Sequence, residues 1–223
     1  MEKRLRIKYA IVPVKDLSRA KERLSSILPQ DVRTDLAYAM LEDVLTALTG
    51  SKLLERIFIV TMDRNAMEIA RAMGVEVIEE TEQNGESDSI DRASLVCKEM
   101  GARSVLVIPG DAPLIKAEDI DFILGKESGS PSVILVPARD GMGTNAILRN
   151  PPDVIPSRFG EDSFRKHIDE AEKRDIPISS YENERVGLDI DHPDDLKIFA
   201  SEKSDTRTYQ LLYRKNILAK ITG

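Results

Sequence analysis

The stretch VLVIPGDAPL, residues 105–114, is the most informative junction in the sequence. Four apolar residues run straight into Pro-Gly-Asp-Ala-Pro, which predicts a buried strand ending at a tight turn that carries one carboxylate, Asp111. Asp111 is a turn residue on one interpretation and a metal ligand on the other. The second interpretation needs a parallel sheet, because such sheets bind ligands outside the carboxyl ends of their strands.

Strand-like and helix-like segments alternate on both sides of this junction. Apolar runs predict strands at 9–14, 57–61, 75–80, 104–109 and 132–138. Helical periodicity and end signals predict helices at 31–48, 64–73, 90–100, 116–125 and 163–174. We expect a glycine-rich turn at 140–148, a late strand at 176–180, and a short strand and helix within 187–200. This alternation predicts βαβ units and one α/β domain, residues 1–204, with a mostly parallel sheet.

The C-terminal segment, residues 205–223, is expected to be a helical extension of that domain. Its apolar residues recur at helical spacing: Tyr209, Leu212, Tyr213, Ile217 and Ile221. Two interpretations stay open, because such a face either packs back on its own domain or forms a homodimer contact.

The composition is that of an ordinary globular protein, with 41% hydrophobic and 32% charged residues. The net charge of −7 argues against a nucleic-acid or membrane-surface partner. The single cysteine, Cys97, excludes an internal disulfide and favours a reducing compartment. No segment approaches the roughly 20 apolar residues of a membrane span, so we expect a cytoplasmic protein.

Four cations follow the first predicted strand within nine residues: Lys15, Arg19, Lys21 and Arg23. A negatively charged protein that binds phosphates needs such a local cluster, because lysine and arginine neutralise phosphate charge. The alternative is a basic, solvated helix face. Neither a dinucleotide-binding glycine pattern nor a P-loop is present in the sequence.

A second acidic motif is GLDIDHPDDL, residues 187–196. On a strand, Asp189 and Asp191 point to the same face, and two like carboxylates held together favour a cation between them. Magnesium prefers oxygen ligands of this kind. Alternatively, Asp191 caps the helix that begins near Pro193.

Small and polar residues follow the fifth predicted strand, among them Gly143, Thr144 and Asn145. Ser163 is expected to cap the next helix, with Gly160 close by. Helix N-termini and glycine turns offer free backbone N–H groups that bind phosphate or carboxylate. The alternative is that these are ordinary turns and a helix cap.

Taken together, five stretches resemble the CofC family, the 2-phospho-L-lactate guanylyltransferases of deazaflavin coenzyme (coenzyme F-420) biosynthesis. They are PVK…AKERL, PGDAP, DGMGTNAIL, FGEDSFRKH and GLDIDHPDDL, in this order over most of the chain. The resemblance implies a Rossmann-like nucleotidyltransferase fold of the glycosyltransferase-A type, a three-layer sandwich that binds nucleoside triphosphate near the first strand.

The resemblance also implies roles for individual residues. Magnesium ligands would be Asp111, Asp189 and Asp191. The triphosphate would face Lys15, Arg19 and Lys21, of which Lys15 and Lys21 act in catalysis together with Asp111. Gly85 and Ser89 would contact the base or ribose of GTP. The phosphorylated acceptor would be held by Thr144, Asn145, Gly160 and Ser163.

The implied reaction joins GTP and 2-phospho-L-lactate into lactyl-2-diphospho-5'-guanosine and releases pyrophosphate. A phosphate monoester has a second pKa near ~6, so the attacking oxygen is ionised at neutral pH and needs no general base. His167 is then either a helix residue near the acceptor or an acid or base. Phosphoenolpyruvate and 3-phosphoglycerate are alternative acceptors, and a non-catalytic nucleotide-binding subunit is the alternative from another class of protein.

Overall fold

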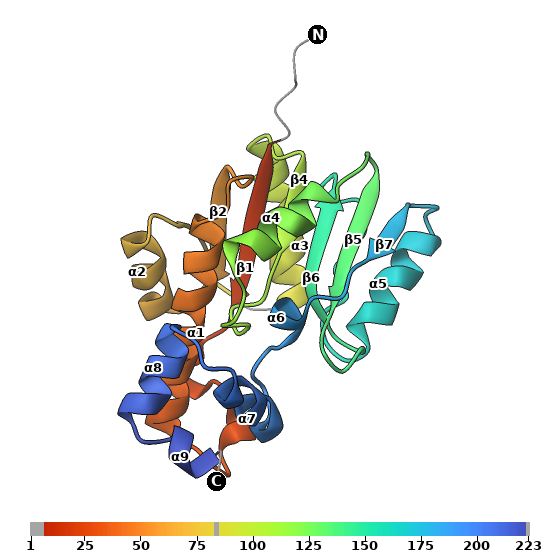
Figure 1. The fold of residues 1–223 in the computed structure, drawn as a ribbon. Coiled ribbons are helices and arrows are strands. Elements are labelled where there is room, and N and C mark those ends of the chain that lie inside the picture. The colour runs from red at the N-terminus through yellow and green to blue at the C-terminus, as the bar shows by residue number, and fades with distance from the viewer. Residues whose placement is uncertain (1–6, 83–84, 222–223) are drawn as a thin grey trace.

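The computed structural model describes residues 7–82 and 85–221. Its centre is a seven-stranded sheet in the order β3-β2-β1-β4-β6-β5-β7 (Figure 1). The strands are β1 (Lys8–Val14), β2 (Arg56–Thr61), β3 (Glu76–Glu79), β4 (Ser104–Val107), β5 (Ser132–Pro137), β6 (Thr144–Asn150) and β7 (Ile178–Ser180). Only β6 runs antiparallel to its neighbours, β4 and β5, so the predicted mostly parallel sheet is confirmed.

The strand β6 corrects one prediction, because residues 140–148 were expected to form a turn. The segment instead returns through the sheet between β4 and β5. The sequence hides this strand because Arg149, which is fully buried, interrupts the apolar pattern. Its guanidinium donates to Asp91 at 2.8 Å and to the carbonyl of Ile155 at 3.0 Å, which offsets part of the cost of burial, while its Nε has no hydrogen-bond partner among the described residues.

Helices cover both faces of the sheet, which gives the expected three layers (Figure 1). One face packs against α1, α2, α4 and α6, and the other packs against α3 and α5. The helices are α1 (Gln30–Thr49), α2 (Arg64–Ala72), α3 (Glu86–Glu99), α4 (Ala117–Gly125), α5 (Ser163–Glu172), α6 (Glu184–Gly187), α7 (Pro193–Ser201), α8 (Arg207–Arg214) and α9 (Leu218–Ile221), with 3-10 turns η1 (Leu17–Arg19) and η2 (Glu22–Leu24). Asp63 caps α2, accepting the N–H of Ala66 at 2.9 Å.

A further apolar core lies past the carboxyl end of β1, where α7, α8 and α9 pack beside α1 (Figure 1). Leu24 of η2, Ile190 and Leu212 of α8 are all fully buried there. The C-terminal segment therefore packs back on its own domain. Tyr213 of α8 stays 70% exposed, and the homodimer contact and the domain boundary at 204 remain predictions.

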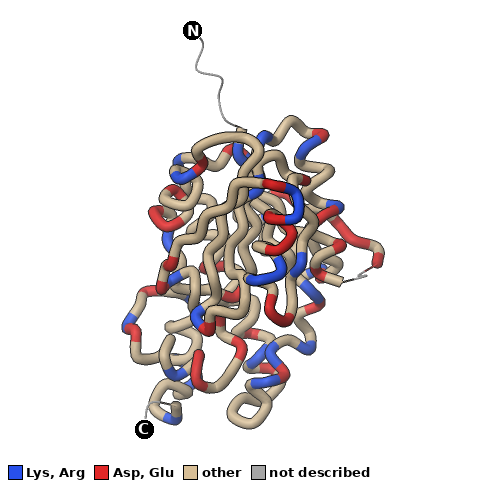
Figure 2. The backbone as a smooth tube through the Cα atoms, turned by 90° about the vertical axis from the view of Figure 1, so that its right-hand side faces the viewer, with Lys and Arg blue, Asp and Glu red and all other residues tan. Residues whose placement is uncertain are grey.

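Charged residues of both signs are interspersed along the chain (Figure 2). Positive charge near any one site is therefore a local property of a few side chains. Within residues 7–82 and 85–221, we find no helix with the length and hydrophobicity needed to span a bilayer.

Candidate active site

The turn after β4 is held close to β1 and α1. A Cβ atom on Gly110 would lie 3.3 Å from Leu41 Cδ1 and 3.5 Å from Val12 Cγ1, so the close approach of this turn favours glycine. The next residue, Asp111, accepts the backbone N–H of Ile190 on its carbonyl at 3.0 Å. This bond joins the two acidic motifs, which are far apart in the sequence.

The strand expected at the start of GLDID is absent: Gly187 is the last residue of α6, and residues 188–191 follow it as coil. Ile190 is fully buried in the core beside α1, and this anchoring replaces strand pairing. The alternative interpretation of Asp191 as the helix cap is wrong, because His192 occupies the N-cap position of α7. The Asp195 carboxylate accepts the backbone N–H groups of Asp191 and His192 at 3.2 and 2.7 Å.

Asp111, Asp189 and Asp191 nevertheless come together as predicted. One carboxylate oxygen from each lies within 4.8 Å of the others. Asp111 Oδ1 is buried and accepts no hydrogen bond from the described residues. Burial, followed by repulsion from Asp111, raises the pKa of Asp189 to about 6. An unpaired buried oxygen within a set of hard, mutually repelling oxygen ligands fits a magnesium ion.

The ammonium of Lys21 lies inside this cluster. Its Nζ is 2.7 Å from Asp111 Oδ2 and 2.6 Å from Asp191 Oδ1. Burial opposes the charge, but the two carboxylates outweigh it and raise the pKa of Lys21 above its ordinary value. The same ammonium lowers the pKa of Asp191 although burial acts to raise it. Arg23 adds a weaker contact, 3.2 Å from Asp191 Oδ2.

A cavity of about 710 Å³ opens beside the cluster, between the segment after β1 and the start of α3. This volume is typical of sites for small molecules and cofactors. Seven of the residues predicted for the site line it: Lys15, Arg19, Lys21, Gly85, Ser89, Asp111 and Asp191.

Two further lining side chains, those of Lys15 and Ser89, also have partners. Lys15 Nζ lies 3.1 Å from Glu86 Oε2, at the exposed rim of the cavity. The Ser89 hydroxyl donates to the carbonyl of Gly85 at 3.2 Å, within the first turn of α3. Glu86 was missed at the sequence level, although it directly follows Gly85 and faces the predicted triphosphate lysine.

Asp189, in the coil after α6, and the predicted residues around the start of β6 and α5 lie outside the lining of that cavity as far as the described residues show. The side chain of Asn145 donates to Asp189 Oδ1 at 2.9 Å and to the carbonyl of Val186 at 3.0 Å. Asn145 therefore orients a carboxylate of the cluster, a contact that only the folded chain reveals.

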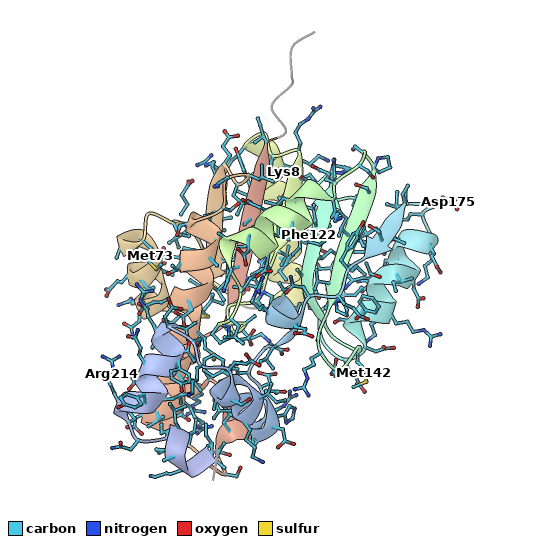
Figure 3. The ribbon with its side chains drawn as sticks, in the orientation of Figure 1. Lys8, Met73, Phe122, Met142, Asp175 and Arg214 are labelled. Carbon is cyan, nitrogen blue, oxygen red and sulfur yellow. The ribbon has the colours of Figure 1, made fainter. Side chains whose placement is uncertain are left out.

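Ser163 was predicted to cap α5, and this prediction is wrong, because Ser163 is the first residue of the helix. Asp162 occupies the cap position with a φ of 53°, and Gly160 precedes it with a φ of 113°. The Ser163 oxygen instead accepts the backbone N–H of Thr144 at 2.8 Å. Met142, labelled in Figure 3 at the end of the β5–β6 loop, accepts the N–H of Phe164 on its carbonyl at 2.9 Å, so this loop is joined to α5.

A family model described as "Guanylyl transferase CofC like" matches residues 8–221 of the chain. The chain belongs to the CofC family. It is similar to a phosphoenolpyruvate guanylyltransferase of Conexibacter woesei, with 35% identity over 84% of this chain and 85% of that one. It is also similar to a 2-phospho-L-lactate guanylyltransferase of Methanothermobacter thermautotrophicus, with 33% identity over 90% and 88%. The predicted enzyme class, a nucleotidyltransferase, is confirmed.

Among solved structures, the chain is similar to a putative nucleotide-diphospho-sugar transferase from Desulfovibrio desulfuricans G20. The TM-score is 0.77 over 96% of both chains, at 19% sequence identity. This likeness confirms the nucleotidyltransferase fold of this CofC-family chain. The individual site residues remain predictions, now supported by the carboxylate cluster and the cavity beside it.

Proposed function

We propose that this chain joins GTP to 2-phospho-L-lactate, giving lactyl-2-diphospho-5'-guanosine and pyrophosphate, in coenzyme F-420 biosynthesis. The observation that carries the proposal is the cluster of Asp111, Asp189 and Asp191 beside a cavity of about 710 Å³ that cationic residues line. A carboxylate cluster next to phosphate-binding cations is the arrangement that transfer of a nucleotidyl group needs.

Asp111, Asp189 and Asp191 would hold magnesium. When bound, the ion would neutralise phosphate charge during the transfer. Lys15 and Arg19 line the cavity with exposed cationic groups and would offset the charge of the triphosphate.

The transfer itself needs little proton chemistry. An oxygen of the acceptor phosphate attacks the α-phosphorus of GTP, and the bond from that phosphorus to the bridging oxygen breaks. Pyrophosphate leaves with the electron pair. Because the acceptor phosphate is ionised at neutral pH, no general base is required. His167 supports this view, since burial is the main cause that lowers its pKa to about 4.

The acceptor is the finer part of the proposal. Phosphoenolpyruvate is the second candidate, because the relative at 35% identity is named for it and the relative at 33% for 2-phospho-L-lactate. Both acids carry a phosphate and a carboxylate on the same carbon. We propose that Thr144, Gly160 and Ser163 hold these two anionic groups.

A pyrophosphate-release assay tests base and acceptor together. GTP, ATP and CTP are each combined with 2-phospho-L-lactate, phosphoenolpyruvate and 3-phosphoglycerate in the presence of magnesium. We expect release only with GTP, and the fastest release with 2-phospho-L-lactate. Release that is fastest with phosphoenolpyruvate selects the second candidate, and no release with any pair contradicts the proposed function.

A further inference from the structure

His167 of α5 is fully buried and makes two specific contacts through its ring. Its Nε2 lies 2.9 Å from the backbone nitrogen of Arg158, and its Nδ1 lies 3.0 Å from Thr144 Oγ1. A backbone N–H can only donate, so Nε2 must accept and carries no hydrogen. The hydrogen of the neutral ring is therefore on Nδ1.

The ring stays neutral at physiological pH. Burial, followed by the positive charge of Arg149, lowers the pKa of His167 to about 4. Because Nδ1 carries the hydrogen, it has no lone pair with which to accept a hydrogen bond. The Thr144 hydroxyl therefore accepts from Nδ1, and its own hydrogen must point elsewhere.

A second hydroxyl, that of Ser163, also accepts a hydrogen bond without donating one to the described residues. The oxygen of Ser163 accepts the backbone N–H of Thr144 at 2.8 Å, so its hydrogen is also available. Thr144 is 5% exposed and Ser163 is 2% exposed, and within the described residues neither hydroxyl donates a hydrogen bond. A nearly buried donor without an acceptor is unfavourable, and an incoming acceptor atom removes this penalty.

The register of the sheet puts this pair close to the carboxylate cluster. Ile147 of β6 pairs with Val107, the last residue of β4, and the two strands are antiparallel. Thr144 therefore lies three residues beyond the end of β4, at the end of the sheet where the turn with Asp111 follows β4. Its neighbour Asn145 contacts Asp189 directly.

We propose that His167 is a positioning residue that sets the Thr144 hydroxyl as a hydrogen-bond donor toward an anionic oxygen of the acceptor acid. The inference rests on the proposed function, in which this part of the site holds the acceptor. It assigns His167 no proton transfer. A hydroxyl held as a donor recognises carboxylate or phosphate oxygens, which accept only.

Two variants separate this role from a merely structural one. His167→Asn retains an amide N–H near the position of Nδ1 and loses the acceptor for Arg158. His167→Gln reaches the position of Nε2 and so retains that acceptor, but it loses the donor to Thr144. The readout is calorimetric binding of 2-phospho-L-lactate and phosphoenolpyruvate in the presence of magnesium, which is independent of turnover.

We expect His167→Gln to weaken binding of the acceptor acid by about 10-fold, the effect of one lost hydrogen bond of ~1.4 kcal/mol, and His167→Asn by less than about 3-fold. Binding of GTP should be unchanged in both variants. Equal weakening in the two variants, no weakening in His167→Gln, or a wild type that binds neither acid would overturn the proposal. A wild type that binds an acid but releases no pyrophosphate with GTP contradicts the proposed function instead.

A measurement on the wild type needs no variant. Nitrogen-15 NMR of the ring of His167 distinguishes the two neutral tautomers, and the chain contains only one other histidine, His192. We expect the hydrogen on Nδ1, without protonation of the ring between pH 6 and 8. A hydrogen on Nε2 would overturn the proposal.

Discussion

The ammonium of Lys21 lies 2.7 Å from Oδ2 of Asp111, although the two residues are 90 positions apart. The lysine side chain is only 10% exposed, and its second partner, Asp191, is 2.6 Å away. Lys21 thus supplies the positive charge that three clustered carboxylates need when no cation is bound. A cation that binds the cluster would therefore compete with this ammonium for the carboxylates that it contacts.

Replacing Lys21 by methionine tests this competition. We expect Lys21→Met to bind Mn²⁺, a probe for magnesium, about 10-fold more tightly in the absence of nucleotide, because one competing charge is gone. Pyrophosphate release should fall by about 100-fold or more, because the same cation is needed on the leaving phosphates. Calorimetry and the pyrophosphate assay measure the two effects.

Arg23→Met is the matched control, because the exposed Arg23 contacts only Asp191 within the cluster. Weaker Mn²⁺ binding by Lys21→Met would show that the lysine supports the cation.

We expect the charged carboxylate of Asp189, a proposed metal ligand, to lower the stability of the metal-free fold. Burial and the neighbouring Asp111 raise its pKa to about 6 from 3.8, so the folded protein binds this proton more tightly than the unfolded chain. The stability contributed by the protonated form is complete below pH 3.8 and is lost as the pH rises through 6. Above that pH, without divalent cations, the charged carboxylate destabilises the fold.

Asp189→Asn removes the charge and keeps an oxygen for the bond from Asn145. We expect it to raise the free energy of unfolding by about 1–3 kcal/mol at pH 7.5 in EDTA, and to abolish turnover. The gain should shrink toward zero near pH 4. Urea denaturation at a series of pH values measures it. A variant less stable than the wild type at pH 7.5 would mean that the Asp189 charge is already compensated in the metal-free protein.

Asn145 is predicted to act on the metal ligand that it contacts. Asn145→Ala should weaken Mn²⁺ binding by about 10-fold, the usual effect of losing a group that orients a ligand, with acceptor affinity nearly unchanged. Asn150→Ala is the control, since Asn150 lies at the opposite end of β6 and donates to Glu127 at 2.6 Å. Weaker acceptor binding with normal Mn²⁺ affinity would contradict this prediction and would mean that Asn145 holds the acceptor, as the sequence suggested.

The C-terminal helix α8 is held by one buried carboxylate. Asp43 of α1 accepts the backbone N–H groups of Arg207 and Thr208 at 2.8 and 2.9 Å, and the Thr208 hydroxyl at 2.7 Å. Asp43→Ala should lower the free energy of unfolding by about 2–3 kcal/mol and speed hydrogen exchange in α8.

The neighbouring residue provides the control for that variant. Glu42 contacts the same helix through Arg207, 2.8 Å away, but lies nearer the solvent. Glu42→Ala should cost less than about 1 kcal/mol, as is usual for such pairs. Equal losses in the two variants would mean that α8 is not anchored through Asp43.

Much of this fold can be predicted from the sequence, because most strands are uninterrupted apolar runs. The segment 105–108 is completely buried and is followed by the Pro-Gly-Asp turn, so both the strand and the carboxylate after it can be predicted from local sequence. Strand β6 escaped prediction because buried Arg149 gives it a charged residue where a core residue is expected. Its partner Asp91 lies 58 positions away, outside any local pattern.

The candidate site likewise has a part that can be predicted from the sequence and a part that cannot. Asp189 and Asp191 could be selected from their types and spacing, although the strand expected to align them does not form. Their approach to Asp111 depends on Ile190, which packs into a core shared with the C-terminal helix. The positions of Lys21 between two carboxylates and of Asn145 on Asp189 are tertiary contacts, and spacing in the sequence carries no signal for them.

The most direct test of the central claim is magnesium-dependent pyrophosphate release from GTP and 2-phospho-L-lactate or phosphoenolpyruvate, compared among the wild type, Asp111→Ala and Asp189→Ala. Thermal unfolding confirms that each variant is folded, and mass spectrometry identifies the guanylylated acid. We predict turnover by the wild type and a loss of about 1000-fold or more in both variants, because each removes an oxygen ligand from the cluster. Turnover by both folded variants at the rate of the wild type would contradict the account.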